Sequence, residues 1–183
     1  MPDQPKFRIA KFDKALHDRS AFSCGIKEID NWLKTSVSDQ IKNNRVRLWC
    51  AINEEGQVIG FYSLNTQSVR PEKAGELARK GERHEIPALY LPCIAISEDY
   101  QEKGLGAALM GHAVSTALNI SEQVGAAALI LDVHKDEHYE RRKAFYTRIG
   151  FAPLGGDKEE RMYLSMKDAR ASQNKADKIT KAA

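Results

Sequence analysis

Residues 101–106, with the sequence QEKGLG, have the composition of a loop that binds an anion. Gly104 and Gly106 lack the side chains that would keep a ligand away from the backbone, and apolar residues at helical spacing follow directly. The first amides of a helix have no partner within it, and the helix dipole adds partial positive charge there. A diphosphate would fit such a loop, although a glycine-rich turn that only caps a helix has the same sequence.

The three cysteines give no sign of a metal site or a disulfide. Cys24, Cys50 and Cys93 are odd in number and far apart, and no C-x-x-C pair or Cys/His cluster occurs. They indicate reduced thiols. The first ten residues have no apolar signal core, and no segment reaches the roughly 18 apolar residues of a membrane span. We therefore expect a soluble, cytoplasmic protein without bound metal or membrane segments.

Length and charge set broader limits. The 183 residues suffice for one domain with an apolar core, which we expect over residues 1–167. Residues 168–183 have little apolar content and several lysines, which predicts a frayed or flexible tail. The net charge of +3 at pH 7 permits an anionic partner but is common among soluble proteins.

The N-terminal half predicts one amphipathic helix followed by a β-hairpin. From Ile26 onward apolar residues recur at helical spacing, and Ser23 is a possible N-cap. Segments 47–52 and 58–69 are rich in β-branched and aromatic residues, and Gly56 between them suits a tight turn.

The C-terminal half predicts alternating strands and helices. Pro92 interrupts an apolar strand, which indicates a bulge or a missing ladder bond. Strand–helix–strand order favours a right-handed crossover between neighbouring strands. The elements expected after the hairpin are, in order, a charged short helix or ordered loop (70–87), the strand 88–97, a helix from Leu105 to about Gly125, the buried strand 127–133, a helix 139–149 that ends at Gly150, and the strand 161–166.

Tyr146 would lie on the last helix, one turn before Gly150, with Phe145 and Phe151 available for core packing. Taken alone, it would be an aromatic residue at the edge of a core. However, the order of strand LPCIAI, loop QEKGLG, helix, strand ALILDV and helix with FYTRIGF resembles the acetyl-CoA-binding half of the GNAT superfamily of N-acetyltransferases over residues 90–152. The resemblance implies an α/β (α+β) fold whose mixed, mostly antiparallel sheet is splayed between two strands and flanked by helices.

The resemblance also implies an acyltransferase with acetyl-CoA as cosubstrate and assigns its site. The amides of the loop bind the pyrophosphate, and the pantetheine arm lies along the interrupted strand like an added strand. Tyr146 matches the family tyrosine whose hydroxyl can protonate the departing thiolate. The coenzyme-binding residues that it implies are Ile94, Ala95, Ile96, Gln101, Glu102, Lys103, Gly104, Leu105, Gly106, Ala107 and Phe145.

The implied reaction is direct attack of an uncharged amine on the thioester, so Cys93 need not act as a nucleophile. No general base is evident. His134, Asp136 and His138 follow a predicted strand, where a solvated loop is the simpler interpretation. Many family members carry an asparagine and a small residue upstream of the tyrosine, whereas this chain has HKDEHYERRKAFY. Its Arg141 and Arg142 are either contacts to the coenzyme or a substrate phosphate, or exposed helix charges.

The N-terminal half, over residues 12–69, resembles the GNAT toxins of bacterial type II toxin–antitoxin systems. In these, F-x-C-G precedes an (I/L)-D-x-W-L helix, as FSCG precedes IDNWL in this chain. The resemblance implies a toxin that acetylates the α-amino group of aminoacyl-tRNA and blocks translation. It also implies a ribbon-helix-helix antitoxin as partner and a possible homodimer. An α-amine is less basic than a lysine amine, so the missing base is consistent with it.

Two alternatives remain open at this point. One is a GNAT enzyme that acetylates a small-molecule or protein amine and is no toxin, and the other is a coenzyme-binding protein without turnover. RNA binding would require a basic surface. The candidates are Lys42, Arg45, Arg47, Arg79, Lys80, Arg83, Arg141 and Arg142, each of which alone is an ordinary solvated charge.

Overall fold

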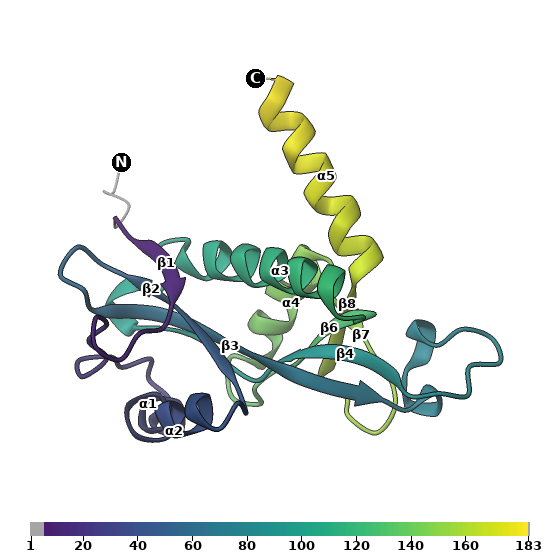
Figure 1. Ribbon diagram of the computed structural model, residues 1–183, viewed down its shortest axis with the longest axis horizontal. Coiled ribbons are helices and arrows are strands. Elements are labelled where there is room, and N and C mark those ends of the chain that lie inside the picture. The colour runs from purple at the N-terminus through teal and green to yellow at the C-terminus, as the bar shows by residue number, and fades with distance from the viewer. Residues whose placement is uncertain (1–5, 183) are drawn as a thin grey trace. The chain divides into compact units, whose positions relative to one another are not determined.

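The computed structural model of the protein describes the backbone of residues 6–182 and the side chains of residues 6–175 (Figure 1). The chain divides into two units. The first consists of the residues up to Asn65 together with Pro92–Ala113. The second consists of Thr66–Leu91 together with the residues from Val114 onward. Strand β3 and helix α3 each contribute residues to both units.

The first unit contains an antiparallel sheet of β1 (Arg8–Lys11), β2 (Arg47–Ile52), β3 (Val58–Val69) and β5 (Ile94–Ile96). Strand β2 lies between β1 and β3, while β5 pairs with β3. The predicted hairpin of residues 47–52 and 58–69 is thus confirmed. The sequence analysis did not predict β1.

The predicted N-terminal helix is present but is not a continuous α-helix. It consists of α1 (Lys27–Asn31), a π-helical turn η1 (Trp32–Ser36) and α2 (Val37–Lys42). The N-cap position is occupied by Ile26, without a side-chain hydrogen bond, so the N-cap expected at Ser23 is wrong. The Ser23 hydroxyl lies instead 3.0 Å from Glu98 Oε2 and 3.3 Å from Asp30 Oδ2.

Both faces of the first unit's sheet are covered. Helices α1 and α2 pack on one face, and the first turns of α3 (Leu105–Gln123) pack on the other (Figure 1). The helix-facing core includes Phe22, Leu33, Val37 and Phe61, each at most 1% exposed. Since successive strand residues point to opposite faces, Gly60 and Tyr62 face α3, and the Tyr62 hydroxyl lies 2.7 Å from His112 Nδ1 on that helix.

The second unit has the strand order β4 (Ile86–Leu91), β6 (Ala128–Asp132), β8 (Arg161–Ser165) and β7 (Ala152–Pro153). Strands β4 and β6 are parallel, whereas β8 is antiparallel to β6 and β7. With the antiparallel first unit, this gives the predicted mixed sheet. The predicted strand 88–97 is divided into β4 and β5 at Pro92 and Cys93, as the proline indicated.

The charged segment 70–87 is an ordered loop with two short 3-10 turns, η2 (Pro71–Lys73) and η3 (Gly75–Leu77). Its Ala74 is fully buried in a second core with Ala88, Ala128, Ile130 and Leu154. The segment thus contributes to the core through Ala74, while its charged side chains are exposed or half-buried.

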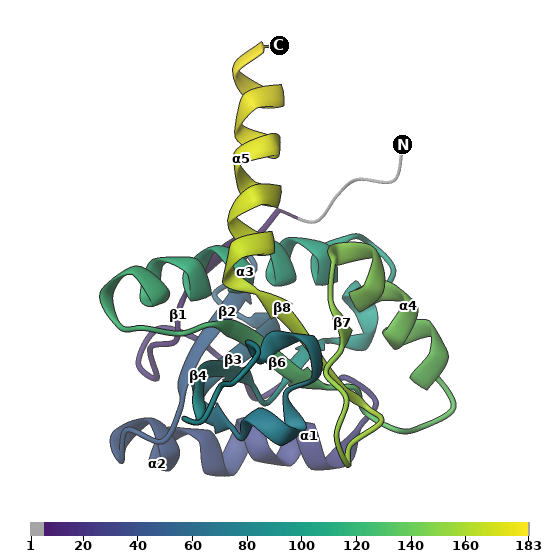
Figure 2. The same cartoon turned by 90° about the vertical axis from the view of Figure 1, so that its right-hand side faces the viewer.

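Helices α4 (Tyr139–Ile149) and α5 (Met166–Ala182) complete the second unit. The tail from residue 168, predicted to be frayed, forms most of α5, which extends away from the end of β8 in Figure 2. Residue 183 lies outside the described residues. The Ser165 hydroxyl accepts a hydrogen bond from the Asp168 amide at 3.1 Å and lies 2.6 Å from the Asp168 carboxylate, which caps the helix start. No helix in the described chain is long and apolar enough to cross a bilayer.

Candidate active site

The predicted anion loop joins β5 to α3 in the first unit. A 3-10 turn, η4 (Glu98–Tyr100), leads into it, and Glu102 and Gly104 both have positive φ, +61° and +82°. The first amide of α3 that donates within the chain is that of Ala108, to the carbonyl of Gly104 at 3.2 Å. In the described chain the amides of residues 103–107 donate no hydrogen bond. Unpaired amides around left-handed residues form a concave surface suited to phosphate oxygens.

The space beside the two loop glycines is empty of protein. A Cβ at Gly104 would meet nothing within 4 Å, and one at Gly106 would meet only Ile96, at 4.0 Å. The positive φ explains glycine at position 104. Neither φ nor packing explains it at position 106, so the open space there is available to a ligand.

Strand β5 provides the edge expected for the pantetheine arm. The Ser97 amide donates to the Ile59 carbonyl and the Ser63 amide to the Cys93 carbonyl, both at 2.9 Å. Hydrogen-bonded pairs alternate along antiparallel strands, so Ala95 directs its backbone groups to β3. Ile94 and Ile96 direct theirs to the opposite edge, which no described strand covers. Ala95 is buried and presents no polar group at that edge.

Gln101 acts as a brace rather than presenting its side chain to the open loop. Its Nε2 donates to the carbonyls of Cys24, at 3.1 Å, and Ile96, at 3.0 Å. The Asp30 carboxylate accepts from the Cys24 amide at 2.9 Å, and Gly25, with φ +88°, turns the chain into α1. The F-x-C-G segment and Asp30 thus fix the start of the loop.

The other predicted loop residues contribute backbone rather than side chains. The Lys103 ammonium donates to the Asp99 carbonyl at 2.6 Å and lies 5.6 Å from the centre of the Tyr100 ring. Leu105 is 1% exposed and belongs to the core. Glu102 and Ala107 are exposed at the surface. An anion at this loop would therefore meet mainly amide groups.

Tyr146 and Phe145 lie on α4 in the second unit. The helix ends in a Schellman motif: the Phe151 amide donates to the Tyr146 carbonyl at 3.1 Å and the Gly150 amide to the Thr147 carbonyl at 3.0 Å. The Tyr146 ring contacts Phe145 and Phe151 edge to face, with centroids 5.4 and 5.9 Å away. Tyr146 is 8% exposed. The segment YTRIGF therefore fixes both the backbone and the ring of this tyrosine.

The three residues considered as general bases lie in the exposed loop before α4. Asp136 accepts hydrogen bonds from the Arg142 guanidinium and from the His138 amide, the latter at 2.8 Å. The bond from Arg142 lowers the pKa of Asp136 to about 2, so this carboxylate is a poor proton acceptor. His134 and His138 lie 3.9 and 3.6 Å from the carboxylates of Asp136 and Glu137. The Arg142 guanidinium is thus bonded to Asp136 at the start of α4.

A polar cluster at the end of β6 was not predicted from the sequence. Asp132 accepts from Arg161 Nε at 2.7 Å and Nη2 at 2.8 Å, and from the Tyr90 hydroxyl at 3.1 Å. Lys158 Nζ lies 3.3 Å away. Burial raises the pKa of Asp132, but the bonds and charge of Arg161 outweigh it, so the pKa is lowered. Asp132 and Arg161 meet because the register of β6 and β8 places them opposite each other. That register cannot be read from the sequence, so the cluster could not be predicted.

The cysteines are free thiols. Burial raises the pKa of Cys24 to about 11 and those of Cys50 and Cys93 to about 12. Nucleophilic catalysis requires a thiolate, so Cys93 is unsuited to an acyl-enzyme. In the described chain no three His, Cys, Asp or Glu side chains gather in a way that could hold a metal ion.

The sequence profile described as "Acetyltransferase (GNAT) family" matches residues 14–151, which include the loop, β5 and Tyr146. The chain belongs to the GNAT family of acetyltransferases. Two similar proteins are named as toxins. "Probable toxin TacT" of Sinorhizobium fredii is 34% identical over 154 residues, 80% of this chain and 84% of that protein. "tRNA-acetylating toxin" of Mycobacterium tuberculosis is 29% identical over 156 residues, 84% of this chain and 89% of that protein.

Solved structures of the toxin AtaT are similar to this GNAT chain over almost their whole length. AtaT complexed with acetyl-methionyl-tRNAfMet matches with a TM-score of 0.81 and 26% identity, covering 91% of this chain and 98% of AtaT. A tyrosine-to-phenylalanine variant of AtaT, bound to the C-terminus of the antitoxin AtaR and to acetyl-CoA, matches with a TM-score of 0.76 and 26% identity. That match covers 90% of this chain and 96% of the AtaT chain.

Proposed function

We propose that this GNAT enzyme is a toxin that transfers the acetyl group of acetyl-CoA to the α-amino group of aminoacyl-tRNA and so blocks translation. The observation that carries the donor half of the proposal is the row of unpaired amides at residues 103–107 beside the open edge of β5. The acceptor half is supported by relatives named as toxins, one of them tRNA-acetylating, and by the tRNA complex of AtaT.

The diphosphate and the pantetheine arm of acetyl-CoA are assigned to the first unit. The diphosphate accepts hydrogen bonds from the amides of residues 103–107, aided by the dipole of α3. The pantetheine arm pairs, as an added strand would, with the outward-facing backbone groups of Ile94 and with the amide of Ile96, whose carbonyl accepts from Gln101. Gln101 holds the loop and the end of β5 together through its two carbonyl partners. Phe145, on α4, is assigned as an apolar contact of the coenzyme.

Tyr146 is proposed as the general acid. The neutral amine attacks the thioester carbonyl, a C–N bond forms and the C–S bond breaks. The departing thiolate takes the proton of the Tyr146 hydroxyl, and the new ammonium group loses its proton to water. An α-amino group has a pKa of about 8 against about 10.4 for lysine. Much of it is therefore neutral near pH 7, and the reaction needs no strong base.

The proposed partners follow from the same assignment. We expect an antitoxin of the ribbon-helix-helix class to neutralise the enzyme, by analogy with the AtaR complex of AtaT. We also expect action in the cytoplasm, where charged tRNA is found, and no metal requirement; a homodimer is compatible with this assignment.

The test is to incubate the purified protein with labelled acetyl-CoA and a pool of charged tRNA and to follow label on the RNA-linked amino acid. Label that requires charged tRNA is expected, and expression without antitoxin is expected to arrest growth. Tyr146→Phe should lower turnover about 10²-fold or more. Tyr163→Phe is the matched control, because Tyr163 belongs to the separate core beside the 70–87 loop.

Other results would count against the proposal. An unchanged rate of the chemical step in Tyr146→Phe would remove this tyrosine from the mechanism. Acetylation of a small-molecule or protein amine without label on RNA would make the chain a GNAT enzyme of another substrate class. Tight binding of acetyl-CoA without turnover on any amine would make it a binding protein.

A further inference from the structure

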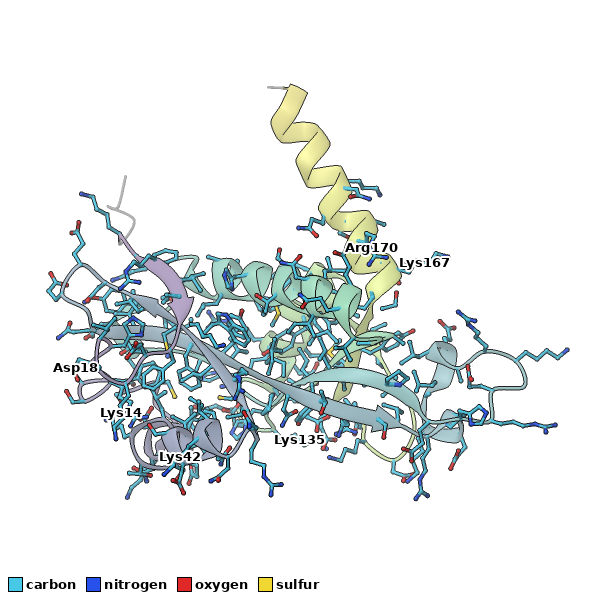
Figure 3. The ribbon with its side chains drawn as sticks, in the orientation of Figure 1. Lys14, Asp18, Lys42, Lys135, Lys167 and Arg170 are labelled. Carbon is cyan, nitrogen blue, oxygen red and sulfur yellow. The ribbon has the colours of Figure 1, made fainter. Side chains whose placement is uncertain are left out.

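Four cations surround a hollow in the first unit, between the loop after β1 and the π-helical turn. The hollow has a volume of about 990 Å³, and its lining includes Lys14, Arg19, Lys34 and Arg45 but only one carboxylate, Asp39. An adjoining hollow of about 650 Å³ shares Lys14, Arg19 and Lys34 and adds Asp18. Figure 3 labels Lys14 and Asp18 on the loop and Lys42 on α2. We refer to the two hollows together as the basic groove.

Arg19 is held in place within the basic groove. Its Nη1 donates to the Leu33 carbonyl at 2.7 Å, and its guanidinium lies 5.3 Å from the centre of the Phe12 ring. A guanidinium carries five N–H donors, and the others have no acceptor in the described chain. The group therefore offers a fixed set of donors that need not be ordered when an anion binds.

The π-helical turn explains why Arg19 can be fixed there. A π-turn interrupts the regular i to i−4 pattern, so some carbonyls of the helix lose their usual amide partner. Here the Val37 amide donates to the Trp32 carbonyl, five residues back, and the Leu33 carbonyl accepts from Arg19 instead. Lys34, Thr35 and Ser36 of the turn line the basic groove. The interruption of the helix thus builds part of this surface.

The basic groove contains a hydroxyl without a hydrogen-bond partner and cations without an ion pair, which is consistent with a binding site for an anion. The Ser38 hydroxyl is buried and has no hydrogen-bond partner in the structure, and it lines the larger hollow. Within residues 6–175, Lys14, Lys34 and Arg45 form no ion pair. The cations outnumber the carboxylates of Asp18 and Asp39 in the lining, so they repel one another, and an anion would relieve that repulsion.

We infer that the basic groove binds the phosphate backbone of the RNA substrate, an inference that rests on the proposed function. Three cations shared by two adjoining hollows suit successive phosphates better than one small anion. The one aromatic side chain that lines either hollow is that of His17, which is only 6% exposed, so the bases have little stacking surface there. The basic groove therefore contributes affinity for any tRNA and no preference among sequences.

The test measures binding of uncharged, fluorescently labelled tRNA by anisotropy at several salt concentrations. The variant Lys14→Gln/Lys34→Gln removes two charges and leaves Arg19 and its bond to the helix intact. We expect its affinity to fall about tenfold at 0.15 M salt, with the slope of log K against log salt reduced by about 2. The loss should be equal for unrelated tRNAs.

The matched control is Lys6→Gln/Lys11→Gln. Both control lysines are exposed in the same unit and lie outside the basic groove, and the change in net charge is the same. Equal losses in the two variants would overturn the inference, because net charge alone would then explain RNA binding. Unchanged RNA binding with weakened antitoxin binding would also overturn it and would assign the basic groove to an acidic protein segment.

The outcome is separable from that of the proposed function, because uncharged tRNA binds without acetyl transfer. If wild-type protein acetylates no aminoacyl-tRNA but loses tRNA affinity only in the groove variant, the RNA site stands and the activity fails. If acetylation occurs and the groove variant retains wild-type KM for charged tRNA, the activity stands and the RNA site fails. Acetylation of a free amino acid ester should be equal in wild type and groove variant.

Discussion

A substitution at Gly60 tests both the packing of α3 and the binding of acetyl-CoA. A Cβ added there would lie 2.8 Å from Leu109 Cδ1, 3.0 Å from Ile96 Cδ1 and 3.3 Å from Leu105 Cδ2. Its backbone does not have positive φ, so Gly60→Ala would act through packing alone. Leu105 and Leu109 are 1% and 0% exposed and cannot turn into solvent. Overpacking at such a site costs about 2 kcal/mol, which lowers Tm by about 4–8 °C in a chain of this size.

The same substitution should weaken acetyl-CoA binding. Its contacts press on Ile96, whose backbone borders the free edge of β5, and on Leu105, in the first turn of α3. Displacing either element misaligns amides that we assign to the donor. The loss of one hydrogen bond to a charged group corresponds to about a tenfold loss of affinity. Calorimetric titration with acetyl-CoA measures this loss, and thermal unfolding measures the stability.

Gly111→Ala is the matched control on α3. A Cβ there would meet nothing within 4 Å, and alanine stabilises a helix interior by up to about 1 kcal/mol over glycine. We therefore expect its Tm to rise and its acetyl-CoA affinity to stay unchanged. Wild-type Tm and wild-type affinity in Gly60→Ala would refute the reasoning, since α3 would then not depend on the bare backbone at position 60.

Three further predictions concern single groups. Asp132→Asn should lower the free energy of unfolding by about 2–3 kcal/mol in urea titrations, because Arg161, 16% exposed, loses its charged partner. The folded-state pKa of Asp132 is lowered. This stabilisation is therefore complete above the ordinary carboxyl pKa of about 4 and is lost as pH falls through the lower folded value. A gap to wild type that does not shrink as pH falls below about 4 would contradict it. Gln101→Leu should raise the KM for acetyl-CoA about tenfold through loss of its two bonds to carbonyls, and an unchanged KM would show that the loop does not need the brace. The pKa values of Cys24 and Cys93 are raised to about 11 and 12. At pH 8 they should therefore react with iodoacetamide about 10²-fold and about 10³-fold more slowly than an unfolded thiol. Mass spectrometry of native and urea-treated protein would show this, and equal rates would contradict the burial.

Local patterns predicted most elements of the fold. The spacing of the apolar residues in the first helix also indicated a π-turn, which we did not predict. Ile29, Leu33, Val37 and Ile41 are each four residues apart. An α-helix turns about 40° beyond a full turn in four residues, so three such steps would rotate the last residue off the core face. A π-turn rotates less per residue, and η1 in this span brings Val37 and Ile41 back to the core. Repeated spacing by four was therefore the signal for the π-turn.

The candidate site was predictable where it depends on backbone and neighbours in sequence. The glycines of the loop and the YTRIGF end of α4 act locally, and both are formed as expected. The partners of Gln101 and Asp132 were not predictable, because the Cys24 carbonyl lies 77 residues before Gln101 and Arg161 lies 29 residues after Asp132. Helix α5 was missed because composition was weighed without the cap formed by Ser165 and Asp168.

The discontinuity of the first unit has a consequence for the chain during its synthesis. Strand β3 is complete well before the ribosome reaches β5 and the loop, since Thr66–Leu91 must be made in between. At about 5–20 residues per second this takes roughly one to five seconds. During that interval the face of β3 that α3 will cover is open to solvent or to a chaperone. A chain released before Pro92 lacks every amide that we assign to acetyl-CoA, so we expect translation products that end before Pro92 to be enzymatically inert.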